Sequence, residues 1–267
     1  MSQPTPPLKD KWIVVTRPQH QAEQLCNDLK NAGAEVILFP LIKIIPPQKL
    51  SLAKQKLSKL TDYDLIVFIS PNAVEECLKW LNITALKGLT IASVGAKTTA
   101  QLLRHGIQVT ISPLKNYNSE SLLSLPEIQK FGLSTSGKPH KIAILRGEGG
   151  REFLKDALEK QGCVVEYIEL YQRSCPQSSL RTLEIQAKKS QLDMILITSG
   201  TSIEHLFALQ AQNDNNDWLN SAPLLVGSER IRQQVLRYTS HHGTLLSTTN
   251  PSDENLFEKL LKWSKST

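Results

Sequence analysis

Two stretches of the chain repeat one pattern of apolar and polar positions. The segments "DLIVFISPNAVEECL" (64–78) and "DMILITSGTSIEHLF" (193–207) each contain an Asp, four apolar residues, a small polar turn and the start of a helix that carries Glu. A short, unbroken apolar run followed by a helical pattern is typical of a strand buried inside a parallel sheet. The chain therefore repeats a strand–turn–helix unit at an interval of 129 positions (193 minus 64).

Three further pairs of segments recur in the same order. At the offset of 129, "WIVVTRP" (12–18), Gly33 and "AEVILFP" match "KIAILRG" (141–147), Gly162 and "CVVEYIEL". At an offset of 132, "TIASVGAKTT" matches "APLLVGSERI", which leaves room for the polar tract "QNDNNDW" as an insertion, and "NYNSESLLSL" matches "TNPSDENLFEKLL". The two glycines follow amphipathic helices and are expected to stop them.

This repeat predicts the fold class. Strands that alternate with helices indicate an α/β protein with parallel sheets, and 267 residues suffice for two domains. We expect two similar domains, each a parallel sheet flanked by helices.

Each predicted strand ends in a small or polar turn that opens a helix, and we call these turns elbows. We interpret Asn72 and Thr201, each followed three residues later by Glu, as helix N-caps. A single elbow is most simply a helix cap. Because the carboxyl ends of parallel strands meet at one sheet edge, where helix N-termini bind anions, the full set predicts a shared anion-binding cleft. The elbows are Thr16-Arg17-Pro18, Ser70-Pro71-Asn72, Val94-Gly95, Arg146-Gly147, Ser199-Gly200-Thr201 and Val226-Gly227-Ser228.

Composition and charge narrow the possible partners. The net charge of +6 favours an anionic ligand, but the basic residues are dispersed, so we expect no nucleic-acid binding. The longest apolar runs, of five to seven residues, are too short to cross a membrane. The proline-rich start "MSQPTPPLKDK" lacks a signal-peptide core and is interpreted as a disordered lead-in to a cytoplasmic protein.

Metal and cofactor chemistry find little support in the sequence. The four cysteines contain no C-x-x-C pair and are expected to be free buried thiols, and the histidines form no H-E-x-x-H motif. The glycine-rich "RGEGGRE" lacks the ending of a phosphate loop and suits an anion-binding elbow instead. We therefore expect neither a metal site nor a cofactor.

The ordered set of motifs resembles the uroporphyrinogen-III synthase family. The resemblance covers the chain from Trp12 onward and rests on the order of its motifs rather than on any one of them. These motifs are "VTRP" (15–18), "FPLIKI" (39–44), "FISPNAV" (68–74), "SVGAKTT" (93–99), "LRGEGGRE" (145–152), "ELYQR" (169–173) and "ITSGTSIEHL" (197–206).

The resemblance implies a particular domain organisation. Residues 1–41 and 172–267 would form one discontinuous domain, with residues 42–171 inserted as the second, and the crossings "FPLIKIIPP" and "ELYQRSCP" would form a two-stranded linker. It also implies the substrate hydroxymethylbilane, a linear tetrapyrrole with many carboxylates, held in a cleft between the domains. We expect a monomer, with transient contact to the preceding pathway enzyme as a further possibility.

The implied reaction is a cyclisation with loss of water and inversion of the last pyrrole ring, so catalysis would rest mainly on orienting the substrate. Tyr171 of "ELYQR" would face the cleft and donate a proton to the departing hydroxyl; the alternative is a tyrosine packed in the hinge. Thr98 would face the cleft, or else be a helix-surface hydroxyl. The chain departs from the family pattern at Ser228-Glu229-Arg230, where Ser228 or Arg230 would replace a threonine contact.

The remaining substrate-binding candidates are of two kinds. Arg17, Arg146 and Arg151 would pair with carboxylates, or else form ion pairs within the protein. The other elbow residues would bind mainly through backbone N–H groups, and these are Ser70, Asn72, Gly147, Ser199, Gly200 and Thr201. A non-catalytic two-lobed binding protein for a small polyanion is the competing hypothesis.

Overall fold

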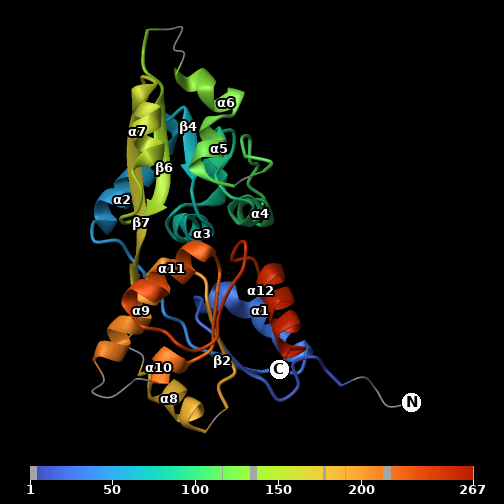
Figure 1. The fold of residues 1–267 in the computed structure, drawn as a ribbon. Helices are drawn as coiled ribbons and strands as arrows, with labels where there is room; N and C mark the ends of the chain where they lie inside the picture. The colour runs from blue at the N-terminus through green and yellow to red at the C-terminus, as the bar shows by residue number, and fades with distance from the viewer. Residues whose placement is uncertain are drawn as a thin grey trace. The chain divides into compact units, whose positions relative to one another are not determined.

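The computed structural model describes residues 5–115, 117–132, 137–176, 179–189, 191–212 and 218–266. Residues 1–4 of the predicted lead-in and most of the "QNDNNDW" tract lie outside these ranges. The chain divides into two compact units, Met1–Lys43 with Ser174–Thr267 and Ile44–Arg173 (Figure 1).

The first unit contains a five-stranded sheet of order β10-β9-β8-β1-β2. All of its strand pairs are parallel, with Val15 beside Leu196 and Ile197 beside Val226. The strands are β1 (Trp12–Val15), β2 (Glu35–Leu38), β8 (Met194–Ile197), β9 (Leu224–Val226) and β10 (Leu245–Ser247).

Alternating strand residues bury the two faces of this sheet against different helices. Ile13 and Val15 pack with α1 (Gln19–Asn31) and α12 (Asp253–Ser264). Val14 points the other way, into a cluster with α8, α9 and α11. That second layer consists of α8 (Arg181–Lys188), α9 (Gly200–Ala211), α10 (Trp218–Ser221) and α11 (Glu229–Tyr238).

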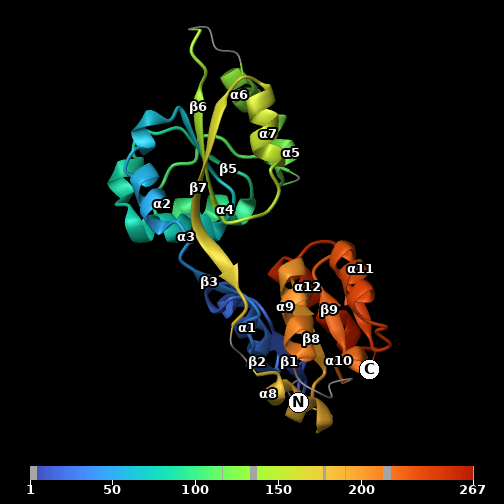
Figure 2. The ribbon, with the colours of Figure 1, turned by 90° about the vertical axis from the view of Figure 1, so that its left-hand side faces the viewer.

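The second unit repeats this architecture with the sheet order β3-β7-β6-β4-β5. The pairs β4–β5, β4–β6 and β6–β7 are parallel. The strands are β3 (Lys43–Ile45), β4 (Leu65–Phe68), β5 (Ile91–Ser93), β6 (Lys141–Gly147) and β7 (Val164–Ser174), and the last is drawn as a long yellow arrow in Figure 2.

Helices again cover both faces of the sheet. One face packs against α2 (Leu50–Leu57), α3 (Pro71–Trp80) and α4 (Ala96–Arg104). The other packs against α5 (Ser119–Leu123), α6 (Pro126–Gln129) and α7 (Phe153–Lys160). Short 3-10 turns η1 (Leu60–Asp62), η2 (Ile83–Leu86) and η3 (Lys130–Gly132) complete the unit. The predicted α/β class with parallel sheets flanked by helices is confirmed.

The predicted helix stops are also confirmed. Gly33 follows α1 with φ +94° and Gly162 follows α7 with φ +91°, a left-handed conformation that side chains rarely adopt. A Cβ on Gly33 would lie 2.7 Å from the Cβ of Pro6, so this close contact also disfavours any side chain at position 33.

Two local expectations were wrong. The N-caps are Ser70 and Ser199, whose hydroxyls accept from the N–H groups of Ala73 at 3.2 Å and Ser202 at 3.1 Å, while Asn72 and Thr201 lie inside the first helical turn. A proline or glycine directly after the cap serine starts each helix earlier than the Glu spacing suggested. The lead-in is ordered from residue 5, because Leu8 is fully buried and its N–H donates to the Ala32 carbonyl at 2.9 Å.

Candidate functional site

Within each unit, three elbows lie on adjacent parallel strands of one sheet. In the first unit they follow β1, β8 and β9, which are neighbours in the sheet, and in the second they follow β6, β4 and β5. Adjacent parallel strands end at the same edge, so each unit has one edge with several helix N-termini. Such an edge offers unpaired N–H donors and suits carboxylates.

Tyr171 lies at the β6–β7 part of this edge but is buried, with 1% of its surface exposed. Its hydroxyl lies 3.0 Å from Ser70 Oγ and accepts a hydrogen bond from Arg173 Nη2 at 3.2 Å. Direct contact of Tyr171 with a ligand stays a prediction, and the packed tyrosine is the alternative that its burial favours. Its ring belongs to the core cluster of the second unit.

Gly147 allows the ring of Tyr171 to take this position. The two residues are register partners at an irregularity between β6 and β7, and a Cβ on Gly147 would lie 2.5 Å from Tyr171 Cε2. Gly147 is thus a packing requirement of the elbow, and its backbone is the only part that can meet a ligand.

Arg146 and Arg17 are both engaged inside their own units. Arg146 is 3% exposed; its guanidinium donates to the Gly147 carbonyl at 3.2 Å and to the Gly149 carbonyl, and stacks 4.2 Å from the Tyr167 ring centroid. These contacts favour the alternative of pairing within the protein, because the donors of Arg146 hold the loop after β6.

Arg17 shows the internal ion pair that was the alternative to substrate binding. Its guanidinium contacts the Asp253 carboxylate and the Pro251 carbonyl, and its Nε donates to Thr198 Oγ1 at 3.3 Å. The side chain is 7% exposed. Arg17 thus joins the β1 elbow to the start of α12 rather than presenting a free cation.

Arg151 and Thr98 have contrasting environments. The Arg151 side chain is 72% exposed, and its guanidinium lies 3.2 Å from the Glu120 carboxylate, so it can exchange that partner for a ligand carboxylate. Thr98 is buried in the first turn of α4. Contact of the Thr98 hydroxyl with a ligand stays a prediction.

The elbows after β8 and β9 are built as helix starts. Ser228 caps α11 by accepting from the Ile231 N–H at 3.3 Å. A Cβ on Gly200 would lie 2.5 Å from Gln234 Oε1, so the end of the Gln234 side chain would have to move. Thr201 and Ser199 are half-buried at the same helix start. Binding of a ligand through the backbone N–H groups of these residues stays a prediction.

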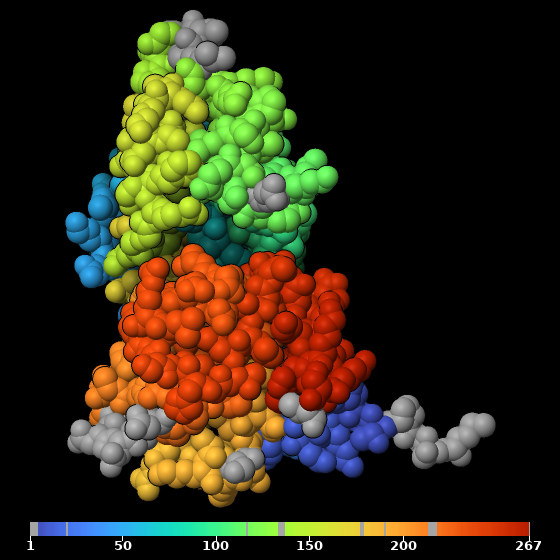
Figure 3. Space-filling view, viewed as in Figure 1, coloured from blue at the N-terminus to red at the C-terminus, as the bar shows by residue number. Residues whose placement is uncertain are grey.

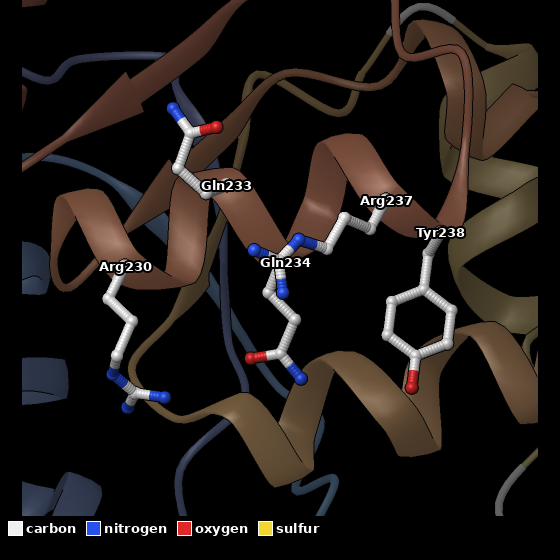
Figure 4. Close-up of a pocket in the computed structure, with 5 residues that line it drawn as sticks. All are labelled: Arg230, Gln233, Gln234, Arg237 and Tyr238. Atoms are coloured by element: carbon white, nitrogen blue, oxygen red, sulfur yellow. The ribbon is translucent and has the colours of Figure 1, made fainter.

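A surface pocket on α11 was missed by the sequence reasoning. It has a volume of about 710 Å³ and is lined by Arg230, Gln233, Gln234, Arg237 and Tyr238. Gln234 and Tyr238 point toward α9, whereas Gln233 points to the opposite side of α11 (Figure 4). The guanidinium groups of Arg230 and Arg237 suit an anionic ligand.

The signal for this pocket was present in the sequence. Arg230 and Arg237 are seven residues apart, which places them on one face of a helix after two turns.

The orange and red segments of the chain form much of the visible surface of the first unit in the space-filling view (Figure 3).

The cysteines are free thiols, as predicted. Cys26, Cys77 and Cys163 are buried and Cys175 is half-buried. Burial raises the pKa of Cys77 to about 12, which keeps this thiol protonated and unreactive at neutral pH. Over the part of the chain that the structure describes, no cluster of His, Cys, Asp or Glu could hold a metal ion, and no helix is long and apolar enough to span a membrane.

Comparison with known proteins gives the family context of these edges. The family model described as uroporphyrinogen-III synthase HemD matches residues 23–242. The uroporphyrinogen-III synthase of Escherichia coli (strain K12) is 32% identical over 222 residues, covering 82% of this chain and 88% of that protein. The synthase of Synechococcus elongatus is 28% identical over 221 residues, covering 79% of each.

Solved structures share the fold. The uroporphyrinogen-III synthetase of Helicobacter pylori 26695 matches with a TM-score of 0.60 and 13% identity over 95% of this chain and 99% of that chain. A mutant uroporphyrinogen III synthase of Thermus thermophilus matches with a TM-score of 0.58 and 15% identity over 96% of this chain and 99% of that chain.

Proposed function

Because the chain belongs to the uroporphyrinogen-III synthase family, we propose that it acts as a lyase that converts hydroxymethylbilane into uroporphyrinogen III with loss of water. The observation that supports binding of this polycarboxylate is the clustering of elbows on adjacent strands of each sheet. Each unit would supply one edge of helix N-termini to the substrate carboxylates.

The proposed chemistry follows from the substrate. Electron density from a pyrrole nitrogen expels the hydroxymethyl oxygen, which leaves as water after taking up a proton, and an electrophilic azafulvene remains. The substituted carbon of the last ring attacks it, and rearrangement through a spiro intermediate inverts that ring before closure. The protein must chiefly hold the chain so that the more distant carbon reacts.

Binding mainly through backbone N–H groups fits the residues found at the sheet edge of each unit. The hydroxyl oxygens of Ser70, Ser199 and Ser228 each accept from one N–H group as helix caps, so the other N–H groups of the first helical turns are left for carboxylates. Exposed cations such as Arg151 would add to the binding. The substrate side chains would thus be recognised by charge and by edge geometry.

The product isomer tests this proposal. Purified protein incubated with hydroxymethylbilane is expected to give uroporphyrinogen III, whereas the uncatalysed reaction gives the unrearranged isomer I. Chromatographic separation of the oxidised products distinguishes the two. Formation of isomer I alone, beside an active control synthase, would contradict the assignment and favour a binding protein.

A further inference from the structure

The hydrogen bonds around Tyr171 have a direction that can be read from the chemistry of their donors. Arg173 can only donate, so the Tyr171 oxygen accepts from Nη2 at 3.2 Å. The phenol proton then needs an acceptor, because a buried donor without one is costly. Among the described residues, the acceptor within hydrogen-bond distance is Ser70 Oγ, at 3.0 Å.

Ser70 completes the chain of hydrogen bonds. Its oxygen already accepts from the Ala73 N–H at 3.2 Å as the cap of α3. With the phenol as a second donor, both lone pairs of the hydroxyl are used and its own proton is left over. Ser70 is half-buried at the elbow after β4, so this proton can point out of the protein, which the buried phenol of Tyr171 cannot do.

We propose that Ser70 delivers a proton to the departing hydroxyl of the substrate, with Tyr171 and Arg173 as positioning residues that supply and hold that proton from behind. This inference rests on the proposed function. It assigns the donating role to the side chain that reaches the surface, and it gives the buried tyrosine a part in the reaction without contact to the substrate.

The internal repeat provides a comparison within the same chain. Ser70 corresponds to Ser199 at the offset of 129, so both units have the capping serine. Tyr171 and Arg173 correspond at the same offset to Ile42 and Ile44, so only the second unit has the phenol and the cation. Ser199 Oγ instead lies 2.8 Å from Ser202 Oγ. Capping alone therefore does not require the tyrosine.

The proton movements balance over the reaction. The carbon–oxygen bond of the substrate breaks, the Ser70 proton goes to the leaving oxygen, and the Tyr171 proton moves to Ser70. The negative charge then rests on the phenolate, beside the Arg173 guanidinium. The spiro intermediate re-opens by breaking the bond between the substituted carbon and its old bridging methylene. The unsubstituted α-carbon of the last ring then bonds to that methylene and loses its proton as the ring becomes aromatic again, and this proton returns to Tyr171 through Ser70. Substrate minus water is the net change, and no co-reactant is needed.

A double-mutant cycle tests the chain of hydrogen bonds. Ser70→Ala and Tyr171→Phe are each expected to lower kcat about 100-fold, the low end for a positioned proton donor, with KM changed much less. Because both act through one proton path, the double variant should be no slower than either single variant. Effects that multiply would overturn the proposal, and so would an unchanged kcat for Ser70→Ala.

Ser199→Ala is the matched control for loss of a helix cap. It removes the capping hydroxyl of α9, so its loss of thermal stability should resemble that of Ser70→Ala. Its effect on kcat should multiply with that of Tyr171→Phe. If both serine variants showed the same coupling to Tyr171→Phe in kcat, the coupling would be merely structural. The proposed proton path through Ser70 would then be refuted.

The role of Arg173 is tested by removing and then restoring its positive charge. Arg173→Met should lower kcat with KM changed much less, because the negative charge that develops on the Tyr171 oxygen loses its cation, and Arg173→Lys should restore kcat in part. An unchanged kcat in Arg173→Met, or no recovery in Arg173→Lys, would remove Arg173 from the proposal. Formation of uroporphyrinogen III by the wild-type protein is a separate measurement. The proton path through Ser70 can therefore be refuted while the proposed function stands.

Discussion

At the scale of single residues, the first unit buries an ionisable group that the proposed reaction does not use. Burial, with the nearby His242 as a smaller cause, lowers the pKa of His241 below its ordinary value of 6.5. The unfolded chain therefore binds a proton at this position more readily than the folded chain. Stability from the neutral histidine is present above pH 6.5 and is lost as the pH falls below that value.

This linkage predicts a pH effect on unfolding. Between about pH 7 and pH 5, the unfolding midpoint of the wild-type protein should fall more than that of His241→Gln, measured by circular dichroism. His242→Gln removes only the smaller cause of the lowered pKa of His241, so this variant should keep most of the wild-type pH dependence. The linkage would be disproved by identical slopes for the wild-type protein and the His241 variant.

At the scale of elements, the pairing of β6 with β7 depends on a close approach. The register shifts between Arg146 and Gly147, and this places the Tyr171 ring over the Gly147 backbone. Bulges of this kind commonly re-aim a side chain near functional sites. Here the irregularity turns the phenol toward Ser70 of α3, so the hydrogen-bond chain depends on both strands.

Gly147→Ala should disturb this junction. A methyl group 2.5 Å from Tyr171 Cε2 must displace the ring, and overpacking of this kind costs about 1–3 kcal/mol. Denaturant unfolding should show the loss, and Gly95→Ala is the control, since its Cβ would make only an ordinary contact of 3.7 Å with Thr98 Oγ1. A Gly147 variant as stable as the control would show that the ring moves freely.

At the scale of the whole molecule, the four hydrophobic clusters each belong to a single unit. Two clusters contain only residues of Ile44–Arg173, and two contain only residues of the discontinuous unit. The inserted unit also has all five strands of its sheet on one continuous stretch apart from the first residue of β3 and the last of β7. A separate core in each unit favours independent folding.

We therefore expect a fragment of residues 44–173 to unfold cooperatively, as measured by thermal circular dichroism, and to form no uroporphyrinogen III. The fragment 174–267 is the control. It lacks β1 and β2, so β8 loses one of its two sheet neighbours and the fragment should not fold. A fragment 44–173 without a cooperative transition would show that its core needs the rest of the chain.

Much of the fold was predictable because it follows from local patterns. The apolar runs at 65–68 and 194–197 are strands in the interior of their sheets, and Gly33 and Gly162 end helices as expected. The predicted caps failed by two residues, since Ser70 and Ser199 cap the N–H groups of Ala73 and Ser202 and so start each helix earlier. A spacing rule cannot rank such neighbours, because the winner depends on where the strand ends.

The sequence by itself determined the repeat, the α/β class and the family, because periodicity, elbows and motif order are properties of residues close together in the chain. Only the tertiary structure decided which candidate side chains are free to bind. Arg17 meets Asp253 across 236 positions and Tyr171 meets Ser70 across 101, and such distant partners are selected by packing. The physical reason is that burial and pairing depend on three-dimensional neighbours, which no local pattern records.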